Sequence, residues 1–554
     1  MKHISLVFYL LFLFGSLIRA QETTAERVFV HLDKDCYIAG EDVWMKFLVV
    51  DNNLLPSTLS SVGYVEISNT EKPYIQTKLA LTNGKGATKV QVPPAMPSGI
   101  YQLSAYTRYM RNEGEAAFFK RQIAVINMTQ QESDKVELVN DTQATTGATT
   151  GSQPIKLSTH RKEYGKRSEV LLSLNELPKN LNDLVISVVR NDSVAVVSSQ
   201  TNWQEQFRPS QTISAYNWTP EYEGHTITGK LNGTKNLDFL ESSIAFVGED
   251  IRVMFGSTNT NNQTVSFYTT DVYGKQDVVT SVLYNHKPAK DFRLDIVSPY
   301  AASPAETLPP LKVVPENKKL IDRFIGIQLQ QTMFTDSPGT QTPLDNLYGF
   351  TPVVSYDLDE YTRFPSVEQT IIEFILRAVV RKVDGERRLK VFWEDQKRFN
   401  TGNTMVLLDG VPLYDHEHIL NYNPFLIKYI HIYDGKYSFG GNFYDCIMSF
   451  ITYKSNLPSI QLGSESQLFV YDCPELPVTF HPAPRYEDSE SRESIRPDFR
   501  HTLHWEPFAE RMAENAQPIS FYTSDLSGEF KVVAEGITAD GKVVRGVTFF
   551  VVNE

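Results

Sequence analysis

The sequence predicts a multidomain, mainly β protein in which several β-sandwiches accompany one α/β module. Short apolar or alternating segments recur at regular spacing with Gly and Pro between them, which is typical of antiparallel sandwiches. Residues 356–456 differ, because helix-like and strand-like patterns alternate there. A chain of 554 residues has room for about three to five domains of ordinary size.

The first 20 residues have the pattern of a secretory signal peptide. Lys2 and His3 precede an apolar run from Ile4 to Leu17, and Ala20 ends the segment before a polar stretch. The run is about 14 residues long, shorter than the ~20 residues that a membrane-spanning helix needs. We therefore expect cleavage after Ala20, export, and a mature chain without a transmembrane segment, in the periplasm or at the outer membrane.

Residues 24–128 are predicted to form the first sandwich. Within them, VFVHLDKDCYIAGEDVWMKFLVV (28–50) reads as strands broken by a turn at Ala39-Gly40. The run DKDCYIAGEDVWMKF resembles the macroglobulin-like domains of bacterial and animal macroglobulins. The residues that carry this resemblance are Asp33, Tyr37, Gly40 and Glu41. It implies an immunoglobulin-like sandwich and says little about function.

Residues 129–153 are polar and Thr-rich, a composition that predicts a flexible linker. The first motif then returns in IKLSTHRKEYGKRSEVLLSL, which places Tyr164 on Tyr37 at an offset of 127 residues. We therefore predict a second macroglobulin-like β unit at 154–222. Residues 223–303, with the EYEGHTITG strand, resemble carboxypeptidase-regulatory-like β domains.

A helix and a connecting loop are predicted for residues 304–355, because Leu320, Phe324 and their neighbours follow helical spacing after Pro315. In residues 356–456, Ser366 and Gln369 form a capping box at the start of a second helix. Strand-like segments follow this helix, so the module is expected to be α/β.

Residues 404–454 of this module resemble the plug domain of TonB-dependent outer-membrane receptors. A VxxDGVPL-like strand and turn lead to an IxxIxV-like strand and a GxIxxxTxK-like strand. The plug-like motif consists of Asp409, Gly410, Val411, Pro412, Gly440 and Lys454. The pair Asp409-Gly410 itself predicts a tight turn. Only 100 residues follow Lys454, too few for the receptor's barrel.

Residues 457–554 are predicted to form a C-terminal sandwich-like domain. The segment SFYTSDLSG (520–528) repeats SFYTTDVYG (266–274), which indicates related β modules. The cysteines are Cys36, Cys446 and Cys473, and three cysteines cannot form a disulfide scaffold. Buried thiols are the simpler interpretation, and a Cys446–Cys473 bridge is the alternative.

Few residues point to catalysis or metal binding. The imidazoles of His416 and His418 flank Glu417, but no further ligands stand at zinc-like spacing, and His501 and His504 precede a structural Trp505. The carboxylates Asp357, Asp359 and Glu360 are the candidates for a glycan-active enzyme, although local ion pairs with Arg363 and the approach of a helix explain them more economically. No serine-nucleophile elbow, phosphate loop or Cys-Gly-Glu-Gln thioester occurs in the sequence. We predict no cofactor and no metal.

The net charge of −13, without a basic tract, argues against nucleic acid as a partner. The chain as a whole resembles a family of large Bacteroidota envelope proteins with macroglobulin-like domains and a plug-like domain that lacks its barrel. The match rests on DKDCYIAGEDVWMKF, SGIYQLSAYTRYMRN, EYEGHTITG, LDEYTRFPSVEQ, LLDGVPLYD and PDFRHTLHWEP.

This resemblance implies a non-enzymatic protein that binds envelope or outer-membrane proteins, or polymers, with a link to TonB-dependent transport. A glycan-active enzyme and a structural or adhesive stalk are the alternatives. The sequence does not identify a small ligand.

Overall fold

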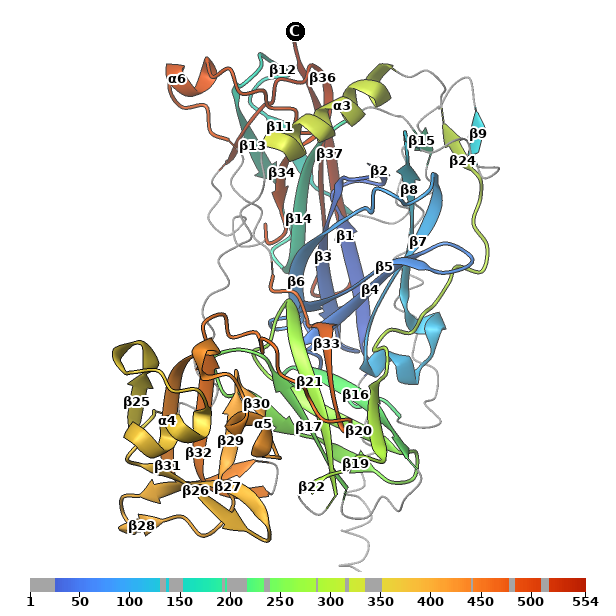
Figure 1. Ribbon diagram of the computed structural model, residues 1–554. Coiled ribbons are helices and arrows are strands. Elements are labelled where there is room, and N and C mark those ends of the chain that lie inside the picture. Colours follow the sequence, from blue (N-terminus) through green and yellow to red (C-terminus); the bar gives the residue numbers. More distant parts are fainter. Residues whose placement is uncertain are drawn as a thin grey trace, which may run out of the picture. The chain divides into compact units, whose positions relative to one another are not determined.

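The computed structural model consists mostly of β-strands arranged in several sheets, which confirms the multidomain, mainly β fold class (Figure 1). The structure describes residues 25–129, 136–138, 153–191, 195–196, 217–233, 240–284, 287–313, 318–333, 351–439, 442–477, 484–509 and 518–554. The predicted signal peptide (1–20) and most of the predicted linker (129–153) lie outside these residues.

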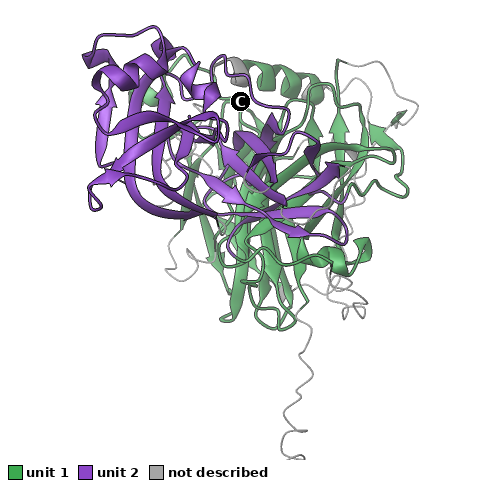
Figure 2. Cartoon of the chain, turned by 60° about the horizontal axis from the view of Figure 1, so that its bottom comes forward, with its two compact units in different colours: residues 1–222, 302–334, 477–554 green, residues 223–301, 335–476 purple. Residues whose placement is uncertain are grey.

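The chain divides into two compact units, each assembled from segments far apart in the sequence (Figure 2). Unit 1 comprises Met1–Tyr222, Ala302–Phe334 and Pro477–Glu554, and unit 2 comprises Glu223–Ala301 and Thr335–Leu476. Among the described residues, no helix is both long and apolar enough to cross a membrane.

The first sandwich of unit 1 consists of a three-stranded sheet, β1-β3-β6, and a five-stranded sheet, β2-β8-β7-β4-β5. Its elements are β1 (Arg27–Leu32), β2 (Cys36–Ile38), β3 (Asp42–Val50), β4 (Val62–Ser68), β5 (Pro73–Ala80), β6 (Lys85–Gln91), β7 (Gly99–Thr107), η1 (Tyr109–Asn112), η2 (Glu115–Ala117) and β8 (Phe119–Ile126). Strand β4 is buried on both faces, because Tyr64 donates a hydrogen bond to Glu221 and Glu66 accepts one from the amide of Ala302. Later segments of unit 1 thus cover the outer face of this sheet.

The second sandwich combines the middle of the chain with its last strands. Its elements are β10 (Gln153–Pro154), β11 (Lys156–Thr159), β12 (Glu163–Tyr164), β13 (Glu169–Asn175), β14 (Leu181–Arg190), α6 (Ser489–Arg492), β34 (Thr502–Glu506), β35 (Ile519–Tyr522), β36 (Gly528–Thr538) and β37 (Val543–Val552). Strand β14 lies between β34 and β36, and β13 pairs with β35. The segments predicted as separate domains, 154–222 and the end of 457–554, therefore share one core.

The two sandwiches of unit 1 repeat one local arrangement, in keeping with the echo of Tyr37 in Tyr164. Tyr37 lies on β2, which runs parallel to β8, and Tyr164 lies on β12, which runs parallel to β37. Each phenol bonds the side chain four residues earlier and a backbone group three residues earlier: Asp33 and Lys34 for Tyr37, His160 and Arg161 for Tyr164. A tyrosine thus occupies the same position in both sandwiches, although the Tyr37 hydroxyl donates to a carbonyl and the Tyr164 hydroxyl accepts from an amide.

Unit 1 also contains helix α3 (Lys318–Met333), the helix expected after Pro315. Beside it lies a small sheet of three strands, β9 (Val136–Leu138), β15 (Ala195–Val196) and β24 (Leu311–Val313). Leu320 of α3 packs with Leu311 and with Ile38 of the first sandwich. Strand β9 falls within the predicted linker and pairs with β24.

The first part of unit 2 is a sandwich of two sheets. Its strands are β16 (His225–Gly233), β17 (Leu240–Phe246), β18 (Val253–Phe255), β19 (Ser257–Asn259), β20 (Thr264–Thr269), β21 (Lys275–Tyr284), β22 (Lys287–Pro288), β23 (Phe292–Ile296) and β33 (Ser466–Asp472). Strand β33 lies within the predicted C-terminal domain, yet it pairs with β21. Tyr471 of β33 enters the core because its side chain points to the face that β16 and β20 cover.

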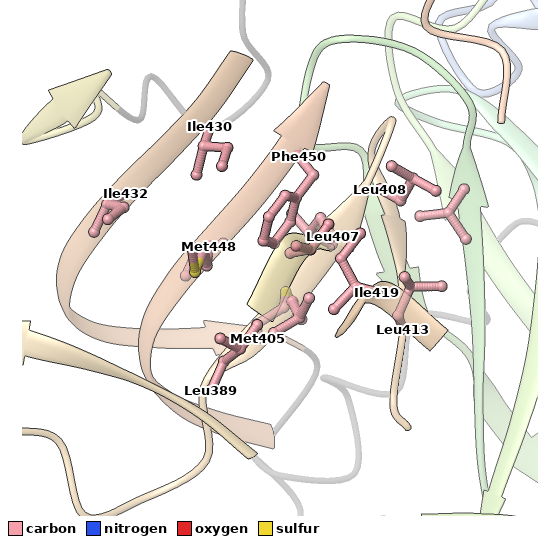
Figure 3. Close-up of a cluster of buried hydrophobic side chains, with 14 of the residues drawn as sticks. Leu389, Met405, Leu407, Leu408, Leu413, Ile419, Ile430, Ile432, Met448 and Phe450 are labelled. Carbon is pink, nitrogen blue, oxygen red and sulfur yellow. The ribbon is translucent and has the colours of Figure 1, made fainter. Parts of the chain in front are cut away.

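The second part of unit 2 is the α/β module. Its elements are β25 (Val354–Asp357), η3 (Leu358–Glu360), α4 (Val367–Phe374), β26 (Ala378–Val383), β27 (Glu386–Trp393), β28 (Arg398–Phe399), β29 (Met405–Leu408), β30 (Val411–Pro412), α5 (Glu417–Leu420), η4 (Pro424–Leu426), β31 (Ile427–Phe439) and β32 (Asn442–Thr452). Ser366 caps α4 by accepting a hydrogen bond from the amide of Gln369, as expected. The core lies between the five-stranded sheet, β27 and the helices (Figure 3).

Candidate functional site

The Asp409-Gly410 pair forms the predicted tight turn between β29 and β30. Leu408 is opposite Val411, so the turn has two residues, and φ is positive at both (46° and 77°), as type I′ hairpins require. A Cβ on Gly410 would lie 2.8 Å from the carbonyl oxygen of Asp250. Glycine is therefore required here by the backbone angle and by the close approach of a neighbouring segment.

The Asp409 side chain is fully buried and connects three strands of the module. Its carboxylate accepts hydrogen bonds from the amide of Thr452 (2.7 Å), the hydroxyl of Thr452 (2.7 Å) and the amide of Leu457 (2.8 Å). The turn is thereby fixed to the end of β32 and to the loop that follows. This is a structural role, because the carboxylate is fully buried and its hydrogen bonds hold the turn, β32 and the following loop together.

Asp409→Ala should lower the free energy of unfolding of unit 2 by about 2–4 kcal/mol, because two buried amides and a hydroxyl would lose their acceptor. Urea unfolding measures the change, followed by the part of the tryptophan fluorescence that Trp393→Phe removes, because Trp393 is the tryptophan of the α/β module. Asp415→Ala, at a less buried turn carboxylate, is the matched control. A loss below about 1 kcal/mol for Asp409→Ala would contradict the role assigned to its carboxylate.

The remaining plug-like motif residues divide between the core and the surface. Val411 and Pro412 are buried in β30, whereas Lys454 is exposed directly after β32. Gly440 lies outside the described residues. These placements do not bring the motif together at one exposed site, so its described members build the module rather than line a pocket.

An exposed aromatic surface lies on the same module around Arg363. We call it the Arg363 surface, and it consists of Asp359, Tyr361, Arg363, Phe425 and Tyr453. The guanidinium donates to the carbonyls of Pro424 (3.1 Å) and Ile427 (2.8 Å), to the Tyr453 hydroxyl (2.8 Å) and to Asp359 (2.5 Å). Arg363 thus fixes three segments that are distant in the sequence.

The aromatic members of the Arg363 surface remain open to solvent. Tyr361, Phe425 and Tyr453 are 40, 56 and 50% exposed. The Tyr361 ring stacks on Phe374 of α4 with centroids 4.4 Å apart, which fixes its orientation. The module therefore presents exposed aromatic rings, of which Tyr361 is oriented by stacking on Phe374 and Tyr453 by its hydrogen bond to Arg363.

Two of the three carboxylates proposed for glycan hydrolysis, Asp357 and Asp359, have structural partners. The carboxylate of Asp357 accepts a hydrogen bond from the amide of Asp359 and thereby caps η3. The hydroxyl of Tyr453 and the guanidinium of Arg363 lower the pKa of Asp359. A general acid needs the opposite, a raised pKa. No contact in the described structure gives Glu360 a catalytic partner.

The histidines of the His416-Glu417-His418 segment are not arranged as a metal site. The Nδ1 atom of His416 accepts the amide of Leu389 (2.9 Å), and burial, with Arg388 and Lys390 nearby, lowers its pKa to about 3. Glu417 pairs with Arg387. Within the described residues, no three His, Cys, Asp or Glu side chains gather as metal ligands.

The other two histidines named from the sequence, His501 and His504, and the cysteines are largely buried. His504 stacks on Phe521, and burial together with Arg500 lowers its pKa to about 4. His501 is buried beside the Glu41 network described below. Cys446 and Cys473 are buried and no disulfide joins them, while Cys36 is half-buried.

The macroglobulin-like motif connects elements of unit 1. Asp33 accepts hydrogen bonds from Tyr37 (2.8 Å), from the amide of Trp44 (3.2 Å) and from Thr502 of β34 (2.9 Å). Gly40 has a φ of 98° in the turn between β2 and β3, and its amide donates to Val92. The motif thus joins the first sandwich to the second.

Glu41 of the same motif binds helix α3. Its carboxylate accepts two hydrogen bonds from Arg323 (2.9 and 2.7 Å), and both side chains are over nine-tenths buried. Burial by itself would raise the pKa of Glu41, but Arg323 and Lys34 outweigh this effect and bring it to about 2. The carboxylate therefore stays ionised as the counter-ion of a buried arginine.

A second buried ionic cluster joins the two sandwiches of unit 1. The Lys46 ammonium lies 2.5 Å from Asp183, and neither side chain is exposed. His31 lies 3.5 Å from Asp183 and 3.7 Å from Glu535. Burial opposes ionisation of Asp183, yet Lys46, His31 and Lys85 together lower its pKa.

Sequence reasoning missed most of these partners. Arg323 was a detectable signal, because it and Asp322 are charged residues within an apolar stretch, between Leu320-Ile321 and Phe324. Lys46 and Asp183 gave no comparable signal, because 136 residues separate them.

Comparison with known proteins does not assign this chain to a family. No protein-family model and no curated protein matches the chain. A Salmonella α2-macroglobulin reacted with methylamine aligns at 9% identity over 97% of this chain and 40% of its own, with a TM-score of 0.22. Trypsin-activated α2-macroglobulin from Escherichia coli aligns at 9% identity over 96% and 42%, also at 0.22.

The Yersinia pseudotuberculosis adhesin InvE aligns at 10% identity over 49% of this chain and 58% of its own, with a TM-score of 0.14. The chain spans about two fifths of the length of the macroglobulins that it matches. At these TM-scores the alignments support no functional argument.

Proposed function

We propose that this chain is a non-enzymatic protein of the cell envelope that binds other proteins or polymers. The observation that supports this function best is the Arg363 surface. Protein interfaces are enriched in Tyr, Phe and Arg, and these residues contribute much of the binding energy. Three exposed aromatic rings lie on the segments that Arg363 holds together, and this composition fits an interface.

The Arg363 surface is also organised before any partner arrives. Binding costs free energy when side chains must be immobilised, at about 0.5–1.5 kcal/mol for each flexible side chain. Here Tyr453 is hydrogen-bonded to Arg363 and Tyr361 is stacked on Phe374. A partner would therefore meet rings that are already oriented.

The partners we propose are envelope or outer-membrane proteins, including components of TonB-dependent transport. This finer proposal rests on the resemblance of residues 404–454 to receptor plug domains, which contact such systems. The site of action would be the periplasm or the outer membrane. The paired carboxylate chemistry of a glycosidase receives no support from Asp357, Asp359 and Glu360, for the reasons given above.

Affinity capture from envelope extracts tests the proposal. Residues 21–554 would be immobilised as the wild type and as the Tyr361→Ala/Phe425→Ala variant. Tyr268→Ala, which removes an exposed tyrosine of the sandwich in unit 2, is the matched control. Captured partners should be lost from the double variant, with at least a tenfold weaker Kd, and retained by the control. Equal capture by all three proteins would contradict the assignment.

A further inference from the structure

Strand β33 forms an open edge of the sandwich in unit 2. Its seven residues pair with β21 in unbroken antiparallel register, from Ser466 opposite Ser281 to Asp472 opposite Lys275. Among the described residues, β33 pairs with no strand other than β21. One side of β33 is therefore bonded to its own sheet and the other side is an edge.

The hydrogen bonds at the two ends of β33 show which backbone groups point to the edge. The amide of Cys473 donates to the carbonyl of Gly274 (2.8 Å), and the amide of Val282 donates to the carbonyl of Glu465 (3.2 Å). Hydrogen-bonded and non-bonded pairs alternate along an antiparallel ladder. The backbone groups of the odd-numbered residues from 465 to 473 are therefore bonded to β21. Those of the even-numbered residues, which include Leu468 and Val470, point to the open edge.

The side chains of the same two residues are exposed. Leu468 is 52% and Val470 is 64% exposed on the outer face of the sheet, whereas Tyr471 is in the core and Phe469 packs against it. Edge strands in soluble proteins are usually protected by lysine, proline or a bulge. The sequence SQLFVYD contains neither lysine nor proline, and its register has no bulge.

We propose that β33 pairs antiparallel with β33 of a second copy of this chain, so that two sandwiches share one continuous sheet. A two-fold axis at Phe469 places Leu468 of each copy opposite Val470 of the other copy. Because both residues direct their backbone groups outward, each such pair forms two hydrogen bonds. All seven residues of the strand take part in this register.

The strand is complementary to itself in side-chain character as well. In this register the most exposed aliphatic residues meet across the new strand pair, where such contacts contribute to sheet stability. Asp472, the charged residue of the strand, faces Ser466 rather than another Asp472. A strand of an unrelated protein would match these positions only by chance, whereas a second copy matches them by symmetry. The observations therefore favour a second copy.

The dimer should be weak. A single strand pair buries less surface than the ~1,600 Å² of a standard interface, so we expect a Kd on the order of 10 μM. Sedimentation velocity of residues 21–554 at concentrations from about 1 to 200 μM should show a monomer that converts to a dimer. This measurement uses the protein alone and is independent of the proposed binding function.

Val470→Pro is the decisive variant. Proline removes an N–H that points to the edge and leaves the bonds of β33 to β21 in place. It should weaken dimerisation at least tenfold without changing the melting temperature of the monomer. Leu468→Lys, which places two cations near each other across the axis, should act in the same direction and serves if the proline variant folds poorly. Tyr268→Ala, at an exposed residue on the other sheet, should dimerise like the wild type.

Three results would overturn the proposal. The first is a wild-type protein that stays monomeric at 200 μM, even if its edge captures a strand of another protein. The second is a dimer that both variants retain. The third is a dimer that the Tyr268→Ala control loses to the same extent, which would place the interface elsewhere.

Discussion

Arg323→Met should destabilise unit 1 by about 3–5 kcal/mol, the usual cost of removing one partner of a buried ion pair. Glu41 would be left buried without the two hydrogen bonds that Arg323 donates, and the carbonyl of Cys36 would lose a third. Four of the five tryptophans belong to unit 1 and Trp393 belongs to unit 2. Urea unfolding in a Trp393→Phe background therefore follows unit 1 by fluorescence.

The double variant Glu41→Gln/Arg323→Met should recover part of this loss, because it leaves no buried charge without a partner. Lys156→Met, at the exposed Lys156–Glu176 pair of unit 1, is the matched control and should change stability by less than about 1 kcal/mol. If Arg323→Met proved as mild as this control, the pair would not fix α3 to the first sandwich.

Asp183→Asn should have an effect of similar size, about 3–5 kcal/mol, on the same unfolding transition. The ammonium of Lys46 would stay buried without the negative charge of Asp183 beside it, although neutral oxygens such as the carbonyl of Leu184 (3.2 Å) could still accept from it. Because folding lowers the pKa of Asp183, its contribution is fully present above the ordinary aspartate pKa of about 3.9. The difference from the wild type should therefore be full between about pH 4 and the ordinary histidine pKa of about 6.5. It should shrink below about pH 4, and it should shrink in part as the pH rises and His31, whose pKa Asp183 raises despite burial, loses its proton.

Lys46→Met/Asp183→Leu tests whether the charge imbalance is the cause. Replacing both ions with apolar side chains of similar size should restore most of the stability lost in Asp183→Asn. A double variant less stable than Asp183→Asn would show instead that His31 and Lys85 need the carboxylate. An unchanged transition in Asp183→Asn would contradict any stabilising role of the cluster.

Local features of the fold could be predicted because their causes lie within a few residues. The Ser366 cap needs only Gln369, and the Asp409-Gly410 turn needs only residues that accept positive φ. The similarity of Tyr37 and Tyr164 was visible because both follow a strand and precede a turn. These predictions depend on short-range chemistry that the sequence displays directly.

Strand pairing was less predictable, because apolar alternation does not identify the partner strand. Residues 457–554 read as one further domain, but β33 pairs with β21 and β36 pairs with β14. The candidate surface was hidden for the same reason. Pro424 and Tyr453 meet Arg363 only after three separate segments have folded together.

The position of β14 between β34 and β36 has a consequence for the order in which the protein folds. Both neighbours of β14 come from residues 502–538, more than 300 positions later in the chain. During synthesis, the segment 181–190 must remain without its sheet while unit 2 emerges and has time to fold. Contacts of such long sequence separation form slowly. Unit 1 therefore cannot complete its second sandwich until the last strands of the chain have emerged.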